Sequence, residues 1–153
     1  ACDTMGYGVN FPGAVIPRSV QGIIYALHVH AGVPCELIEW HGHNDFYKAV
    51  TNSTTAWLYG CAGVNTSIFG IGERTGNTPL EAMVFEYAQL KGHLNGMDTT
   101  VITELAEYYE REIGYHIPER TPFVGNINKQ YEYLSTEKIF YFMPRKFVYN
   151  GFP

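Results

Sequence analysis

The chain alternates short strand-like runs with segments of helical periodicity, and this alternation limits its fold more than any other feature. Residues 37–43 and 64–69 are compact runs of strand length, and each precedes a stretch in which apolar residues recur at helical spacing. Strands that alternate with helices are typical of βα units, in which the strands pair in parallel. The sequence therefore predicts an α/β fold.

Four helices are expected from the apolar spacing and from the residues that begin and end helices. The third is preceded by Thr78-Pro79-Leu80-Glu81, which has the pattern of a capping box with proline at the first helical position. The aromatic-rich segment 126–153 follows neither the strand period nor the helix period, so no element is assigned to it. The expected helices cover residues 17–31, with Gly32 as a left-handed end, and then residues 46–60, 80–92 and 99–113.

Length, charge and cysteine content exclude several classes of protein. At 153 residues the chain is long enough for one domain with a real core. Its net charge of −5 and the lack of a basic cluster argue against nucleic-acid binding, and the lack of a long apolar run argues against a membrane span. The three cysteines have unrelated spacings, which indicates a reducing, cytoplasmic location. The negative charge is concentrated in residues 78–120, where we expect it to cover a solvated helical face.

The pattern His-x-His occurs twice, and the two copies have different meanings. His28 and His30 fall inside the first expected helix, where residues two apart point away from each other, so we interpret them as surface histidines. His41 and His43 end an expected strand, where residues two apart project from the same face with Cα atoms about 6.6 Å apart. Two imidazoles at that separation can converge on one cation, which makes this pair a candidate metal site.

Further polar groups follow the expected strands. Asp45 is suited to orient a metal-binding histidine or to cap the next helix, and both roles are open. Residues 70–77, Gly-Ile-Gly-Glu-Arg-Thr-Gly-Asn, form a glycine loop that matches neither the Walker nor the dinucleotide-binding pattern. Because ligands bind at the carboxyl ends of parallel strands, we expect this loop and its Asn77 to face the same crevice as His41 and His43.

Together these motifs resemble the isopropylmalate synthase and homocitrate synthase family, which includes Re-citrate synthases. The resemblance rests on residues 41–45 (His-Gly-His-Asn-Asp), on the glycine loop 70–77 and on residues 2–6 (Cys-Asp-Thr-Met-Gly), and it covers about residues 1–125. Members of this family are (β/α)8 barrels that condense acetyl-CoA with a 2-oxo acid by means of a divalent metal. The resemblance implies that residues 1–125 hold strands six to eight of such a TIM barrel, and that residues 126–153 are a divergent tail.

The same resemblance implies roles for single residues. His41 and His43 match the two metal-binding histidines, Asn77 matches an asparagine near the metal, and Thr4 matches a threonine at the 2-oxo acid. It implies Mg²⁺, Mn²⁺ or Zn²⁺ as the cofactor and acetyl-CoA as co-substrate, with 2-oxoisovalerate, 2-oxoglutarate and oxaloacetate open as the oxo acid. The family's first-strand Asp-Arg-Glu signature, which supplies another metal ligand and a catalytic arginine, is absent from these residues, so no catalytic residue is assigned.

A complete (β/α)8 barrel needs about 250 residues, so we expect the chain to be part of a longer protein. It begins Ala-Cys-Asp-Thr, without an initiator methionine. On this interpretation the parent enzyme is active, whereas the isolated chain is inactive and binds metal weakly. Two alternatives are a non-catalytic fragment and a half-barrel subunit. Because unpaired strand edges favour pairing with another chain, we expect a homo-oligomer or a complex with a complementary chain.

Overall fold

The computed structural model describes residues 2–9 and 19–126. Nearly all of the aromatic-rich tail that the sequence analysis left unassigned lies outside these residues. The chain divides into two compact units, Ala1–Tyr87 and Ala88–Pro153, and the boundary falls within one helix. The first unit contains the sheet and every candidate site residue.

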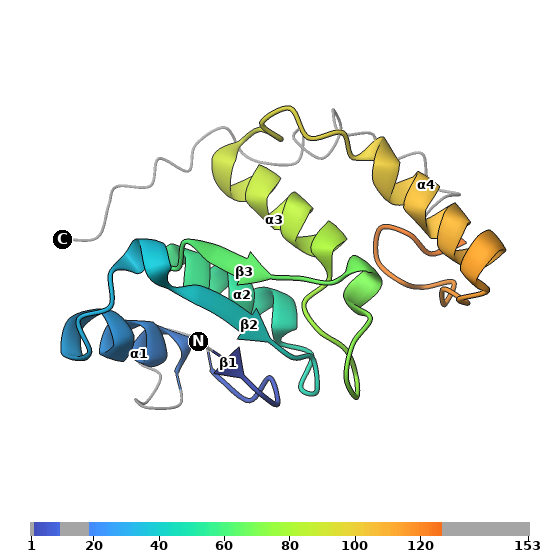
Figure 1. Cartoon of the computed structure of the whole chain (residues 1–153). Coiled ribbons are helices and arrows are strands. Elements are labelled where there is room, and N and C mark those ends of the chain that lie inside the picture. The colour runs from blue at the N-terminus through green and yellow to red at the C-terminus, as the bar shows by residue number, and fades with distance from the viewer. Residues whose placement is uncertain (1, 10–18, 127–153) are drawn as a thin grey trace. The chain divides into compact units, whose positions relative to one another are not determined.

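The sheet of the first unit has three parallel strands in the order β1 (Cys2–Asp3), β2 (Glu39–Gly42) and β3 (Gly63–Asn65) (Figure 1). Cys2 is in register with His41, and His41 is in register with Asn65. The predicted α/β fold with parallel strands is thereby confirmed. Because the strands are parallel, their carboxyl ends all lie at the same end of the sheet, and the loops that follow the strands meet there.

Along the chain, one helix lies between β1 and β2 and another between β2 and β3. α1 (Val20–Tyr25) begins where the Ser19 hydroxyl accepts a hydrogen bond from the Gly22 amide at 2.8 Å, and it continues as a π-helical turn, Ala26–His30. Gly32 has a φ of +69°, which confirms the predicted left-handed end. His28 and His30 are exposed, as expected of surface histidines.

α2 (Ala49–Leu58) begins later than predicted, because Tyr47 has a φ of +57° that a helix does not tolerate. The strand before it is also shorter than predicted. A 3-10 turn occupies Cys35–Leu37, so that β2 begins only at Glu39.

The core of the first unit lies between β2 and the two helices. Trp40, on β2, is completely buried there. Because side chains alternate along a strand, the neighbours of Trp40 on β2, His41 included, project from the other face. Burial raises the pKa of the Cys61 thiol to about 11, so this cysteine packs as a neutral group. The core residues are Val20, Ile24, Ile38, Trp40, Ala56 and Cys61.

α3 (Leu80–Lys91) starts where predicted, but the predicted capping box is wrong. The Thr78 hydroxyl lies 2.9 Å from the Ser53 hydroxyl and 3.4 Å from the Gly42 carbonyl oxygen. The Glu81 carboxylate instead accepts from the Phe69 amide at 3.1 Å, and burial raises its pKa. The Thr78 side chain is thus bonded to α2 and to the end of β2, and the Glu81 side chain to the turn after β3.

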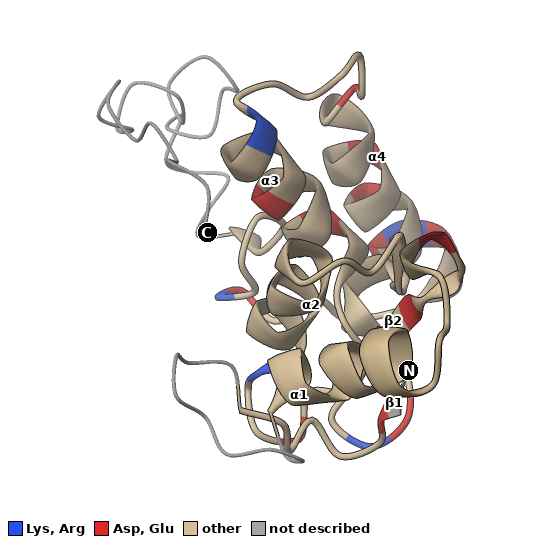
Figure 2. Cartoon of the chain, turned by 90° about the vertical axis from the view of Figure 1, so that its left-hand side faces the viewer, with Lys and Arg blue, Asp and Glu red and all other residues tan. Residues whose placement is uncertain are grey.

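In the second unit α4 (Thr100–Tyr108) extends as a π-helical turn to Ile113 and ends at Gly114, whose φ is +72°. Several acidic residues lie along α3 and α4 (Figure 2). Most of those in residues 78–120 are exposed, as expected of a solvated face, and Glu81 is the buried exception. Among the described residues no helix combines the length and apolar character that a bilayer span requires.

Candidate functional site

The two histidines of the second His-x-His motif lie at the carboxyl end of β2. His41 is on the strand, and His43 follows it in a bridge with Asn77. Their ring centroids are 4.9 Å apart at an interplanar angle of 90°. This confirms that the rings share one side, which strand alternation predicted. His43 is almost fully buried, at 6% exposed, whereas His41 is half-buried.

The glycine loop that follows β3 brings Asn77 to the same place. Its backbone pairs with that of His43, and the Asn44 amide donates to the Gly76 carbonyl oxygen at 2.9 Å. The two ends of the loop are bonded to each other, because the main-chain N–H of Asn77 donates to the Gly70 carbonyl oxygen at 2.9 Å. Asn77 is 34 residues from His43 in sequence, yet the two are neighbours across a bridge, as the expected crevice requires.

Two side-chain atoms at this place are buried without a hydrogen-bond partner: Nδ1 of His43 and Oδ1 of Asn77. Buried polar atoms in native proteins are nearly always paired, and an unpaired one requires an explanation. An imidazole nitrogen and an amide oxygen are both ligands for divalent metals, so these residues fit the metal that the resemblance implies. Within residues 2–9 and 19–126 no cluster of three or more His, Cys, Asp or Glu side chains could hold a metal by itself.

Thr4 lies in the turn after β1 and is exposed. The turn is shaped by Asp3, whose carboxylate accepts from the amides of Tyr7 and Gly8 at 2.9 Å each and from Asn52 Nδ2 at 3.0 Å. Gly6 has a φ of +62° and lies so close to the His43 carbonyl that a Cβ there would overlap it. The turn that carries Thr4 therefore packs directly against the backbone of a candidate metal ligand.

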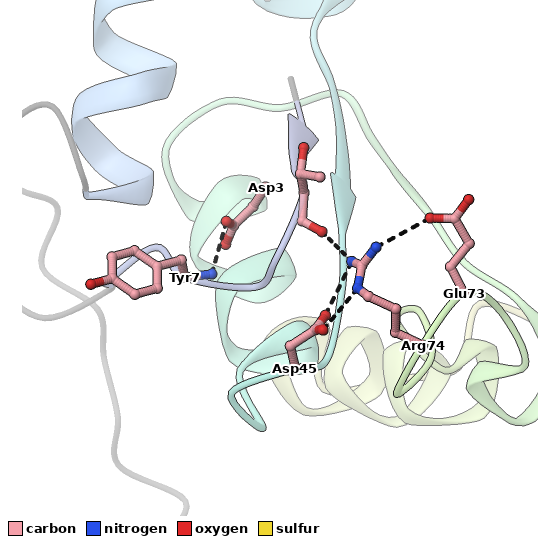
Figure 3. A network of polar contacts seen from close by, with 6 residues as sticks. Asp3, Tyr7, Asp45, Glu73 and Arg74 are labelled. Atoms are coloured by element: carbon pink, nitrogen blue, oxygen red, sulfur yellow. Dashed lines mark hydrogen bonds and ion pairs between the residues drawn. The ribbon is translucent and has the colours of Figure 1, made fainter.

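Asp45 follows the histidine pair and bonds to Arg74 of the glycine loop (Figure 3). Arg74 Nε lies 2.8 Å from Asp45 Oδ1, and the guanidinium lowers the pKa of the Asp45 carboxyl. Asp45 does not cap α2, since the side chain that accepts from the Ala49 amide, at 3.3 Å, is that of Asn44. The capping role is thereby not found, and the role of Asp45 beside the histidines stays a prediction.

Two further residues of this region are not identified by the sequence motifs. Arg74 belongs to the glycine loop, and its charge, opposite to that of Asp45, is the signal that could have indicated the pair. Ser67 follows β3, and its hydroxyl is a third buried atom without a partner. A lone serine gives no pattern in sequence, so only the fold could reveal it.

The position of the Asn77 side chain depends on Gly72, which supplies a direct test of its role. A Cβ at Gly72 would lie 2.6 Å from Asn77 Cγ and 2.8 Å from Oδ1, too close to be accommodated without moving the amide. We expect Gly72→Ala to weaken Mn²⁺ binding by about 10-fold or more, the scale of losing a group that supports a metal site. Stability should change little, because the amide is the mobile end of a side chain.

The control is Gly63→Ala on β3, where an added Cβ would meet nothing closer than 3.7 Å. Mn²⁺ affinity can be measured by electron paramagnetic resonance of the free ion. Equal affinities in the two variants would show that Asn77 is not a ligand.

Comparison with known proteins agrees with this geometry. Residues 8–108 match the HMGL-like family. The chain is 66% identical over 125 residues to the Citrate (Re)-synthase of Clostridium kluyveri, covering 82% of this chain and 28% of that protein. It is 57% identical over 124 residues to the Citrate (Re)-synthase of Syntrophus aciditrophicus, covering 81% of this chain and 20% of that protein. The chain thus spans less than a third of the length of either relative.

More distant similarity extends to other synthases and to a solved structure. Homocitrate synthase AksA of Methanothermobacter thermautotrophicus is 34% identical over 113 residues, covering 74% of this chain and 28% of that protein. An HMG-CoA lyase from Acenitobacter baumannii, solved with coenzyme A and 3-methylmalate, shares the fold with a TM-score of 0.57 at 21% identity. That match covers 78% of this chain and 38% of the lyase chain. The chain belongs to the HMGL-like family, with citrate (Re)-, homocitrate and isopropylmalate synthases among its relatives.

Proposed function

We propose that the protein carrying this chain condenses acetyl-CoA with a 2-oxo acid at a divalent metal held in part by His41, His43 and Asn77. The observation that supports this most is the pair of buried, unpartnered ligand atoms on His43 and Asn77. They stand at the carboxyl ends of parallel strands, where α/β proteins bind their ligands. Similarity to synthases that carry out such condensations supports the same reaction class.

Each residue has a separate task in this proposal. His41 and His43, each through an imidazole nitrogen, and Asn77, through its amide oxygen, would hold the ion, which can be Mg²⁺, Mn²⁺ or Zn²⁺ with this ligand set. When bound, the ion would act as a Lewis acid towards the carbonyl group of the oxo acid. The Thr4 hydroxyl donates to the oxo acid and orients it. Asp45 keeps the loop beside His43 in place through Arg74.

We further propose that the three strands correspond to strands six to eight of a (β/α)8 barrel, with the other strands supplied outside these residues. Oxaloacetate is the favoured oxo acid. The relatives that are 66% and 57% identical are named citrate (Re)-synthases, and citrate is what addition of an acetyl unit to oxaloacetate yields. The chemistry of the candidate residues leaves 2-oxoglutarate and 2-oxoisovalerate as alternatives for the test to separate.

The test is an assay of the protein that carries this chain, with acetyl-CoA and each of the three oxo acids in turn. We expect thiol release and citrate formation with oxaloacetate, loss of both after EDTA treatment, and recovery when Mn²⁺ or Mg²⁺ is added back. Thiol release that persists without metal would contradict the proposal. Within the described residues β1 and β3 are the outer strands of the sheet, so activity that appears only after adding a second chain would favour a split barrel.

A further inference from the structure

Arg74, in the glycine loop, is bonded to two segments that are far from it in sequence, at Thr4 and Asp45, and to its neighbour Glu73 (Figure 3). Its Nε donates to Asp45 Oδ1 at 2.8 Å and its Nη2 to Asp45 Oδ2 at 3.2 Å, which is the two-point geometry of a guanidinium on a carboxylate. Nη2 also donates to the main-chain carbonyl oxygen of Thr4, and Nη1 lies 3.3 Å from Glu73 Oε2. One side chain therefore joins the loops that follow all three strands.

Both distant contacts lie at the candidate site, since Asp45 is two residues after His43 and Thr4 is itself a candidate residue. Arg74 is three residues before Asn77. We propose that Arg74 is a positioning residue that sets where Thr4 stands relative to the metal-binding residues. The inference rests on the proposed function, because it assigns Arg74 a part in binding the oxo acid.

The metal-binding residues have links of their own that do not need Arg74. His43 and Asn77 are joined by their backbone bridge, and Asn44 is joined to Gly76 by a main-chain hydrogen bond of 2.9 Å. The Thr4 turn has an internal scaffold in Asp3 and packs against the His43 backbone at Gly6, and Arg74 adds a bond from the Thr4 carbonyl oxygen to the glycine loop. Loss of Arg74 should therefore displace Thr4 and leave the metal-binding residues in place.

The backbone of Arg74 also points to a specific role. Its φ is +54°, a left-handed conformation that residues with a Cβ rarely adopt. Unfavourable conformations of this kind persist where the surroundings hold them and are concentrated at functional sites. Glycine, which adopts this conformation without steric cost, occupies several other positions of the same loop. At position 74 the chain has instead a large side chain in a sterically unfavourable backbone conformation.

A second arginine of the chain provides a matched control. Arg111 pairs with Glu112 at 2.7 Å, but the two side chains are 73% and 50% exposed, whereas those of Arg74 and Asp45 are 38% and 14% exposed. Exposed ion pairs contribute little, and a pair between neighbouring residues joins no separate segments. Lysine cannot replace Arg74 fully, because an ammonium group lacks the planar fork that reaches Asp45 and Thr4 together.

The experiment compares Arg74→Gln, Arg74→Lys and Arg111→Gln in the protein that carries this chain. We measure the KM for oxaloacetate, the KM for acetyl-CoA and kcat, together with the Kd for Mn²⁺ by electron paramagnetic resonance. In Arg74→Gln we expect the KM for oxaloacetate to rise by about 10-fold or more, the scale of losing an orienting partner. The Mn²⁺ Kd and the acetyl-CoA KM should stay within about threefold of the parent values. Arg74→Lys should recover only part of the loss, and Arg111→Gln should match the parent.

Outcomes that overturn the inference differ from those that overturn the proposed function. An unchanged oxaloacetate KM in Arg74→Gln, or equal losses in Mn²⁺ affinity and both KM values, would show that Arg74 does not position Thr4. A parent protein that condenses none of the three oxo acids would instead remove the proposed function. If circular dichroism shows that Arg74→Gln does not fold, Arg74→Lys and Asp45→Asn take its place. In these variants the KM for oxaloacetate should rise while the Kd for Mn²⁺ stays unchanged.

Discussion

Replacement of His43 by alanine should lower kcat/KM for the condensation by about 100- to 10,000-fold, because a metal ion supplies several kcal/mol of charge stabilisation in such reactions. His43 is the better buried of the two histidines and carries the unpartnered Nδ1. Its removal takes away a buried electron pair that the proposed metal site would use. The Kd for Mn²⁺ should rise in parallel.

The matched control is His30→Ala, which removes an exposed imidazole from the end of the π-helical turn after α1. Activity and Mn²⁺ affinity should be unchanged there, although the edge contact of His30 with the Tyr25 ring is lost. Full activity in His43→Ala would refute the metal assignment. Loss of activity with unchanged Mn²⁺ affinity would mean that His43 acts on the substrate and not on the metal.

The second large effect concerns stability. Trp40→Ala should lower the free energy of unfolding by about 3–5 kcal/mol, the cost of truncating a large aromatic side chain in a core. Trp40 is completely buried, and it packs among Ile24, Ile38 and Ala56 between β2 and the helices. The loss should be visible as a lower denaturant midpoint without a change in slope.

Trp57→Ala is the control, because Trp57 is the other tryptophan of the chain and only partly buried, with its ring 6.5 Å from that of Tyr87. We expect it to cost about 1–2 kcal/mol. The loss of unfolding free energy in Trp40→Phe should lie between those of Trp57→Ala and Trp40→Ala. Phenylalanine retains most of the apolar volume, and the substitution also removes the buried, unpartnered indole nitrogen. Equal costs at both tryptophans would contradict the assignment of the core to the Trp40 side of β2.

Local periodicity was enough to predict much of the first unit. Alternation along a strand predicts that His41 and His43 project from the same side, and their ring centroids are indeed 4.9 Å apart. The left-handed end at Gly32 and the exposure of His28 and His30 also follow from local rules. These properties depend on neighbours within one or two turns of chain, which the sequence displays directly.

Exact boundaries were less predictable. The expected strand over 64–69 is observed only as Gly63–Asn65, and a 3-10 turn over Ile68–Gly70, in which Phe69 has a left-handed φ of +55°, occupies its expected end. The Glu81 carboxylate, 12 residues later, accepts the Phe69 amide and supports that turn. The Thr78 hydroxyl likewise bonds to the hydroxyl of Ser53, 25 residues away, and not to the backbone of the helix that it was expected to cap. A hydroxyl or carboxylate bonds to whichever partner the fold brings nearest, and sequence proximity does not determine it.

By itself, then, the sequence determined the α/β class, the parallel strands and the fact that the two histidine rings share one side of the sheet. Only the tertiary structure decided that Asn77 pairs with His43, that their ligand atoms are buried without partners, and that Arg74 ties Asp45 to Thr4. The reason is physical: periodicity is a local property of the backbone, whereas a site is made where segments distant in sequence converge. Its geometry depends on how the sheet pairs and on how each loop closes over it.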